Sequence, residues 1–162
     1  MIKQIKRGKH KAHLAWDDPR EDMFPKLKLW ADMKMTPEKI TYVYVLVNYW
    51  STTEQDLDRI YKIKSLGMMP FVMIYDKGEF FQGEQRLRPD VWDRFSEEQI
   101  FHACVCRQMQ RWCNNPFVCG SNIPFEEYER YQGMLHRWEN CEQEFKPRLR
   151  LHGKTDEQMS LF

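Results

Sequence analysis

The residues best suited to metal chemistry are five cysteines in the second half of the chain: Cys104, Cys106, Cys113, Cys119 and Cys141. Thiolates hold zinc or an iron–sulfur cluster when their spacing brings them to one point. No Cys-x2-Cys pair or other familiar zinc spacing occurs here. Cys106 and Cys113 can share a helix face, whereas Cys104 and Cys106 cannot. We therefore expect reduced thiols in a core, with a zinc or iron–sulfur role as the alternative.

The histidines and acidic residues form no second reactive constellation. No histidine pair has ligand spacing among His10, His13, His102, His136 and His152. His13 could face a barrel interior, although an ordinary core or surface position is the simpler interpretation. The sequence has no nucleophile elbow and no glycine-rich phosphate loop. The acidic pair Glu126-Glu127 suits the first turn of a helix, where it complements the dipole.

The elements that must position a site are clearest between residues 40 and 75. ITYVYVLV (40–47) is nearly all β-branched or aromatic, which is typical of a strand buried on both faces. Ser51 and Glu54 predict a capping box at a helix N-terminus, and Gly67 suits the position after its end. MMPFVMIY (68–75) predicts another buried strand. The whole segment therefore reads as a βαβ unit with parallel strands.

Ligands of α/β sheets meet the carboxyl ends of the strands, so chemistry is expected at residues 48–50 and 75–77. AHLAW (12–16) predicts an earlier strand. A helix should follow from Pro19 to about Met35, with Pro25 requiring a later start or a bend. Residues 76–94 predict a long loop with a short turn of helix.

The second half of the chain predicts two helices. Ser96 and Gln99 form a capping box for the first helix, which should end near Asn114, and the second should start at Pro124. The polar tail is expected to be disordered up to its last five residues. The predicted organisation is a basic segment at 1–11, an α/β domain at 12–145 and a flexible tail at 146–162.

Composition narrows the class of protein. A chain of 162 residues normally makes one domain. Lys and Arg total 25 and Asp and Glu total 24, which argues against a bulk polyanion partner. The basic residues of segment 1–11 are expected to be solvated, with nucleic-acid contact as the alternative. No apolar run reaches membrane-spanning length and the N-terminus has no hydrophobic signal core, so we expect a cytoplasmic protein without a membrane partner.

Several segments, in this order, resemble the C-terminal half of radical S-adenosylmethionine (radical SAM) enzymes, and more narrowly small members from phages and mobile elements of anaerobic bacteria. They are AHLAWDDPRED, YVYVLVNYWSTTEQDLDRI, KSLGMMPFVMIYDK, RQMQRWCNN and PFEEYERY, and they span roughly residues 12–131. The resemblance implies an α/β fold with parallel strands, a partial (half) (β/α) barrel followed by helices. It also implies S-adenosylmethionine and a [4Fe–4S] cluster as cofactors.

The chain departs from that family in three ways. It lacks the cluster-binding Cys-x3-Cys-x2-Cys loop and the first strands of the barrel. Asn48 stands where the family usually has a glycine after the strand, which removes the most permissive backbone position. The resemblance therefore implies either half of an enzyme or a degenerate remnant. In the first case the N-terminal half and the cluster ligands are on a partner chain or have been lost. In both cases the isolated chain is expected to have no activity.

The resemblance also implies which residues meet S-adenosylmethionine. Asp17 and Arg20 would lie near its ribose or carboxylate, and the segment from Asn48 to Thr53 near its adenosyl part. Phe71 and Tyr75 belong to the stretch that cradles adenine. The simpler alternatives are that Asp17 and Asp18 cap the following helix, that Asn48 merely ends a strand, and that Phe71 and Tyr75 are plain core residues.

The last five residues are Gln158, Met159, Ser160, Leu161 and Phe162. They resemble the bacterial sliding-clamp binding peptide, whose consensus is Gln-Leu-Ser/Asp-Leu-Phe. In such a peptide Leu161 and Phe162 would fill one apolar pocket, Met159 a smaller one, and Gln158 would hydrogen-bond beside them. The alternative is that the terminus packs on its own core or has no role.

Three hypotheses follow for the whole chain. The first is the C-terminal part of a radical SAM enzyme, which contributes part of the S-adenosylmethionine pocket and the substrate wall. The second is a non-catalytic α/β adaptor that binds a sliding clamp or another partner through its tail. The third is an independent metal-binding protein that uses the cysteines. Because a half barrel exposes an open edge and apolar faces, self-association or a partner chain is also predicted.

Overall fold

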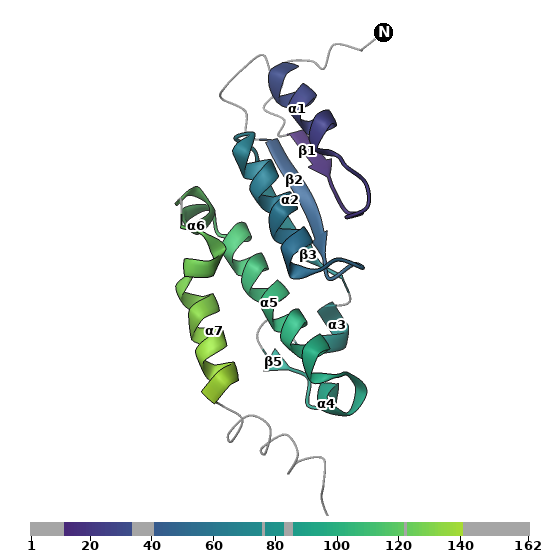
Figure 1. Ribbon diagram of the computed structural model, residues 1–162, viewed down its shortest axis with the longest axis vertical. Coiled ribbons are helices and arrows are strands. Elements are labelled where there is room, and N and C mark those ends of the chain that lie inside the picture. Colours follow the sequence, from purple (N-terminus) through teal and green to yellow (C-terminus); the bar gives the residue numbers. More distant parts are fainter. Residues whose placement is uncertain (1–11, 34–40, 76, 83–85, 122, 141–162) are drawn as a thin grey trace, which may run out of the picture. The chain divides into compact units, whose positions relative to one another are not determined.

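A computed structural model describes residues 12–33, 41–75, 77–82, 86–121 and 123–140 (Figure 1). The chain divides into two compact units, Met1–Met73 and Ile74–Phe162. No helix in the described ranges is long and apolar enough to cross a lipid bilayer.

The first unit is a parallel sheet with two crossover helices, which confirms the predicted mixed α/β class. Its elements are β1 (Ala12–Ala15), α1 (Phe24–Met33), β2 (Thr41–Val47), α2 (Thr53–Ser65) and β3 (Met69–Ile74). The three parallel strands lie in chain order, β1-β2-β3, and His13 is paired with Tyr42 in the β1–β2 register. Helix α2 packs on β2 and contacts α1, so both helices lie on the same face of the sheet (Figure 1).

The two faces of this sheet differ, and the expectation that its central strand is buried on both faces is wrong. Val43, Val45 and Val47 are fully buried on the helix-covered face. The alternate residues of β2 are only half-buried, and Phe71 and Met73 of β3 are each 37% exposed. The pattern arises because both crossover helices cover the same face, which leaves the aromatic positions of the other face uncovered by them.

Helix α1 begins later than Pro19, the start that the acidic residues before it suggested. The chain makes a turn there, in which the Asp18 carboxylate accepts the Arg20 backbone N–H at 2.9 Å. The Asp22 carboxylate accepts the Phe24 N–H at 3.1 Å, and Pro25 then occupies the first turn of α1. Pro25 is tolerated there because the first-turn N–H groups have no helical partner.

Helix α2 has a capping box one residue later than predicted. Thr52 is the N-cap and exchanges hydrogen bonds with Gln55, so the predicted Ser51–Glu54 box is wrong. The C-terminal end agrees with the sequence, because Gly67 has φ +67° and donates its N–H to the Lys64 carbonyl at 2.9 Å. This left-handed conformation favours glycine.

The second unit begins with more structure than the predicted loop. It contains α3 (Lys77–Phe80), β4 (Phe81–Gln82), β5 (Arg86–Leu87) and α4 (Val91–Arg94). Strands β4 and β5 pair antiparallel. Phe80, Phe81 and Ala103 form a small core with Leu87 and Phe95 packed against it. Strands of two residues leave too little periodicity to be recognised in a sequence.

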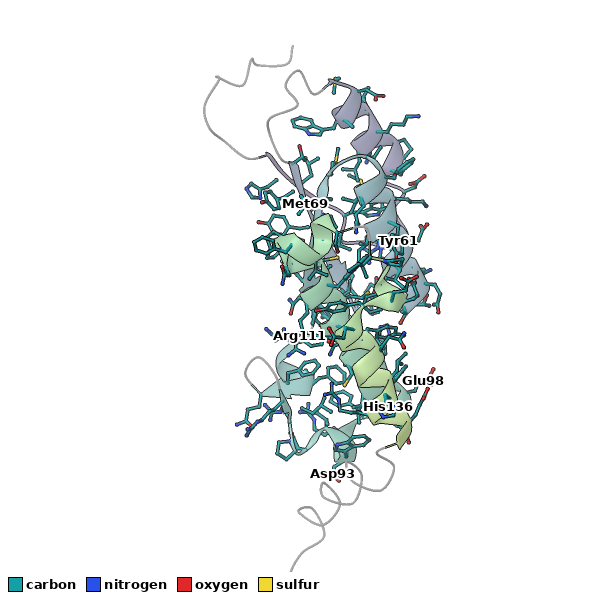
Figure 2. The ribbon with its side chains drawn as sticks, turned by 90° about the vertical axis from the view of Figure 1, so that its left-hand side faces the viewer. Tyr61, Met69, Asp93, Glu98, Arg111 and His136 are labelled. Carbon is teal, nitrogen blue, oxygen red and sulfur yellow. The ribbon has the colours of Figure 1, made fainter. Side chains whose placement is uncertain are left out.

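The helices of the second unit follow as α5 (Glu97–Asn114), α6 (Pro116–Gly120), the 3-10 helix η1 (Phe125–Glu127) and α7 (Glu129–Asn140). In Figure 2 the label His136 marks α7 and the label Arg111 marks α5. The predicted Ser96–Gln99 box is confirmed as the cap of α5. The helix expected at Pro124 instead starts with η1, and α6 was not predicted.

The described cysteines behave as core thiols, as expected. Cys106, Cys113 and Cys119 are buried, and Cys104 is half-buried. Burial raises the pKa of Cys104 to about 12, so this thiol is not a ready nucleophile near neutral pH. Cys141 lies outside the described residues.

Candidate functional site

The carboxyl ends of β1 and β2 lie at the same edge of the sheet because the two strands are parallel. Two segments leave the sheet there, Trp16–Asp22 after β1 and Asn48–Thr52 after β2. Parallel α/β sheets bind their ligands at this edge. Three of the six residues that the radical SAM resemblance assigned to the cofactor, Asp17, Arg20 and Asn48, are on these two segments.

Arg59 of α2 is the hub of this edge, and it is only 2% exposed. Its Nη1 donates to the carbonyl of Trp16 at 2.7 Å and to that of Asp17 at 3.0 Å. Its Nη2 donates to the carbonyl of Leu46 at 2.8 Å. One guanidinium therefore ties together the ends of β1 and β2. The rigid fork of donors on arginine suits this role better than the ammonium of lysine.

The charge of Arg59 is balanced by Asp56, one turn earlier on α2 and fully buried. The Asp56 Oδ1 accepts from the Arg59 Nη2 at 2.5 Å, and its Oδ2 accepts the Asn48 N–H at 3.4 Å. Burial raises the pKa of the Asp56 carboxyl, and the hydrogen bond from Arg59 opposes that rise. A carboxylate this deep would be costly without its arginine, so the two side chains act as one structural unit.

Asp18 and Arg20 form a second, exposed ion pair at this edge. The Arg20 Nε and Nη2 donate to the two Asp18 oxygens at 2.9 and 2.7 Å. Hydrogen bonds from Arg20 lower the pKa of Asp18 to about 2. The pair is bidentate, the geometry in which arginine and carboxylate fix each other best.

The segment after β2 carries two residues in the left-handed region. Asn48 has φ +62° and Trp50 has φ +51°. Asparagine tolerates this region better than most residues, so Asn48 adopts the conformation that a glycine would take at this position. A bulky residue with positive φ is a genuine outlier, and such outliers concentrate at functional sites. No local pattern in the sequence indicated the positive φ of Trp50.

The uncovered face of the sheet is lined by rings. His13 stacks on Tyr42 and Tyr44 with ring centroids 5.7 and 5.6 Å apart, and Phe71 meets Tyr44 edge-on at 5.3 Å. Parallel sheets are usually covered on both faces. An exposed aromatic face on a parallel sheet is therefore a candidate surface for binding a ligand, another layer of strands or a partner.

No family model, no curated protein and no solved structure matches this chain. The sheet edge and the ring-lined face must therefore be interpreted from their own geometry. What that geometry offers is binding: carbonyls fixed by a guanidinium, two carboxylates, and a series of flat rings. A carboxylate oxygen of Asp17 is buried with no hydrogen-bond partner among the described residues. It is an acceptor suited to a hydroxyl or amino group.

The residues predicted from the resemblance are only partly brought together. Asp17, Arg20 and Asn48 share the carboxyl edge, while Thr53 is the first residue of α2. Phe71 lies within β3 on the uncovered face, and Tyr75 follows β3 directly and is 42% exposed. Core positions for these two rings, the simpler alternative, are therefore wrong.

The capping alternative for Asp17 and Asp18 is also wrong, because no helix begins at Pro19. The clamp-like residues Gln158, Met159, Leu161 and Phe162 lie outside the described residues.

Sequence reasoning missed the most important positioning residues. Asp56 and Arg59 are the buried charges of α2, beside Ile60 and Ile63. Two charged residues on the apolar face of a helix were a readable signal, since such residues are almost never fully buried unless paired. The helical spacing was used only to find apolar positions, so this signal was passed over.

The described residues of the second unit do not form a metal centre among themselves. His102 Nε2 and Cys106 Sγ lie 3.6 Å apart, one turn apart on α5. No three His, Cys, Asp or Glu side chains of this unit's described part come within ligand distance of one another. Neither a four-thiolate cluster nor a structural zinc site fits that arrangement. The hypothesis of an independent cysteine metal site receives no support from these residues.

Proposed function

We propose that this chain is the C-terminal part of a radical SAM enzyme, with its sheet forming one sector of a (β/α) barrel. The single observation that supports it is the three-stranded parallel sheet, which runs in chain order, keeps both helices on one face and leaves an aromatic face uncovered. Doubly wound folds carry helices on both faces and reverse their strand order, whereas barrels do neither.

In this proposal the uncovered face is the wall of the barrel interior, and the carboxyl edge holds S-adenosylmethionine. The unpartnered Asp17 oxygen would accept a hydrogen bond from the ribose or the amino group. Asn48 supplies the left-handed turn, and Phe71 and Tyr75 offer rings against adenine. Arg59 and Asp56 hold the two strand ends and orient the Asp17 backbone. A [4Fe–4S] cluster would supply the reducing electron. The given sequence has no Cys-x3-Cys-x2-Cys motif to bind that cluster.

In this proposal the cluster ligands and the remaining strands are supplied from outside these 162 residues. The first test is the coding DNA upstream of Met1, translated in three frames and searched for Cys-x3-Cys-x2-Cys followed by three strand–helix units. The second is anaerobic co-expression of both halves with measurement of 5′-deoxyadenosine released from S-adenosylmethionine. Release by the pair that is lost with Asp17→Asn supports the proposal, and no release, or the absence of such a reading frame, overturns it.

A second function is favoured by the C-terminal peptide and belongs to a different class. A cytoplasmic adaptor would keep the α/β scaffold and bind the bacterial sliding clamp through Gln158–Phe162. The adjacent Leu161 and Phe162 would supply the two apolar anchors that such short peptides need. This places the protein at replication or repair without requiring any catalysis.

Retention on an immobilised clamp tests the adaptor function. Replacing Leu161 and Phe162 by alanine should abolish retention, because the apolar anchors are lost. Ser160→Asp is the matched control, since the consensus accepts either residue at that position. Equal retention of the double variant and the wild type would remove this function from consideration.

A further inference from the structure

Trp50 is an exposed ring at the carboxyl edge that neither function above uses. It follows β2 by three residues and is 73% exposed, with φ +51°. Burial does not account for a strained backbone on a residue this exposed. A left-handed tryptophan persists only when its surroundings hold it, and strain of this kind is typical of binding sites.

Two neighbours hold the ring. Tyr49 stacks on Trp50 with centroids 4.8 Å apart and planes 20° from parallel. The Arg20 guanidinium lies 5.1 Å from the ring centroid, and the bidentate Asp18 pair fixes its plane. Tyrosine, indole and guanidinium thus gather three flat groups, two aromatic and one cationic, at one point of the edge.

Asp17, on the same segment as Arg20, has an unsatisfied hydrogen-bond acceptor. Asp17, next to Asp18, keeps one buried carboxylate oxygen that has no partner among the described residues. Buried acceptors are nearly always satisfied, so this one indicates a donor on a ligand. The proposed function assigns this oxygen to S-adenosylmethionine, so it identifies the edge as a ligand site without selecting the ligand that stacks on Trp50.

We propose that Trp50 is a stacking platform for a base of single-stranded nucleic acid. A flat heteroaromatic ring suits a site made of Tyr49, Trp50 and the Arg20 guanidinium, because bases stack on aromatic and arginine side chains. A sugar would need only one exposed indole face and no cation in the stack. The inference names a substrate class for the proposed function, on which it rests for the reaction but not for the binding.

The test is fluorescence anisotropy of a labelled ten-residue oligothymidine with the full chain at one fixed salt concentration, since such affinities are salt-dependent. Trp50→Ala should weaken binding about tenfold or more, the usual scale for one stacked base, whereas Trp50→Phe should keep most of it. Trp50→Gly removes the ring and relieves the positive φ, so its loss of binding does not come from backbone strain at this position. Phe117→Ala is the control, an exposed ring of the second unit.

The outcomes separate this inference from the proposed function. Oligonucleotide binding that falls with both Trp50→Ala and Trp50→Gly but not with Phe117→Ala supports the platform. Unchanged binding by the Trp50 variants, or no binding at all, overturns it. So does a Trp50-dependent affinity for S-adenosylmethionine or an oligosaccharide without one for the oligonucleotide. Release of 5′-deoxyadenosine by the paired halves is a separate readout, so each idea fails on its own.

Discussion

At the scale of single residues, Arg59 is the main determinant of the geometry of the carboxyl edge. It satisfies three backbone carbonyls from two strand ends and neutralises a fully buried carboxylate. Removal of one partner from a buried ion pair strands the other, which is far costlier than loss of a surface pair. The geometry of the proposed cofactor edge therefore depends on a residue that touches no cofactor.

Arg59→Met should destabilise the chain by about 3–5 kcal/mol, because Asp56 is left buried and uncompensated. Arg59→Lys should give a stability between those of the wild type and Arg59→Met. Lysine keeps the positive charge, but an ammonium cannot reproduce the fork of hydrogen bonds. Urea unfolding followed by tryptophan fluorescence measures both. The control is Lys62→Met, which breaks the half-exposed Lys62–Asp58 pair and should barely move the midpoint. Equal midpoints for Arg59→Met and Lys62→Met would refute the hub.

Asp18 gives a pH prediction. Its pKa is lowered to about 2 by hydrogen bonds from Arg20, against 3.8 for the free group. The contribution of the pair is complete above pH 3.8 and is lost as the pH falls through 2, because the unfolded chain takes up the proton first. Carboxyl NMR shifts should show an Asp18 midpoint near 2 in the wild type and a return toward 3.8 in Arg20→Met. The same midpoint in both would exclude the pair as the cause.

At the scale of elements, two glycines separate conformation from packing. A Cβ added at Gly67 or at Gly133 would meet nothing within 4 Å, but only Gly67 has positive φ, +67°. Gly67→Ala should cost about 1 kcal/mol, the usual price of forcing alanine into the left-handed region. Gly133→Ala, inside α7, should stabilise by about 0.5–1 kcal/mol through helix propensity. Thermal unfolding of the two variants should shift in opposite directions; shifts of the same sign would show that conformation is not the cause.

Local chemistry determined which elements the sequence could predict. The strands at 12–15 and 41–47, the end of α2 at Gly67 and the Ser96 cap were predicted because side-chain pattern or backbone demand marks them locally. The start of α2 was missed by one residue because Ser51–Glu54 and Thr52–Gln55 satisfy the same capping rule. The three-dimensional turn after β2, with two left-handed residues, decided between them.

The site was less predictable than the elements for a related reason. Asp17, Arg20 and Asn48 were predicted from the radical SAM resemblance, and the structure places them after the carboxyl ends of β1 and β2. The Arg59–Asp56 unit and the Trp50 platform were not predicted, because they depend on which strand ends α2 reaches and on a backbone outlier. Neither leaves a periodic signal, and β4, β5 and α6 are too short to leave one.

At the scale of the whole molecule, the uncovered sheet face is the feature most in need of explanation. The sheet leaves part of its apolar surface exposed on the face away from its helices, at Tyr44, Phe71 and Met73. Parallel sheets usually bury both faces. The proposed barrel gives this face a layer of partner strands. In the absence of that partner, the same face should drive copies of the chain together, because like rings bury each other as well as any other apolar surface would.

Phe71→Glu tests this consequence directly. A charge at the 37% exposed Phe71 should lower the molar mass measured by light scattering across a concentration series, since burying an unpaired carboxylate opposes association. Leu29→Glu is the matched control, because Leu29 is 59% exposed on α1 and belongs to the opposite side of the unit from the sheet's ring-lined face. The control should keep the wild-type mass. A wild type that stays monomeric throughout, or a Leu29→Glu effect as large as that of Phe71→Glu, would mean that the ring-lined face is not the associating surface.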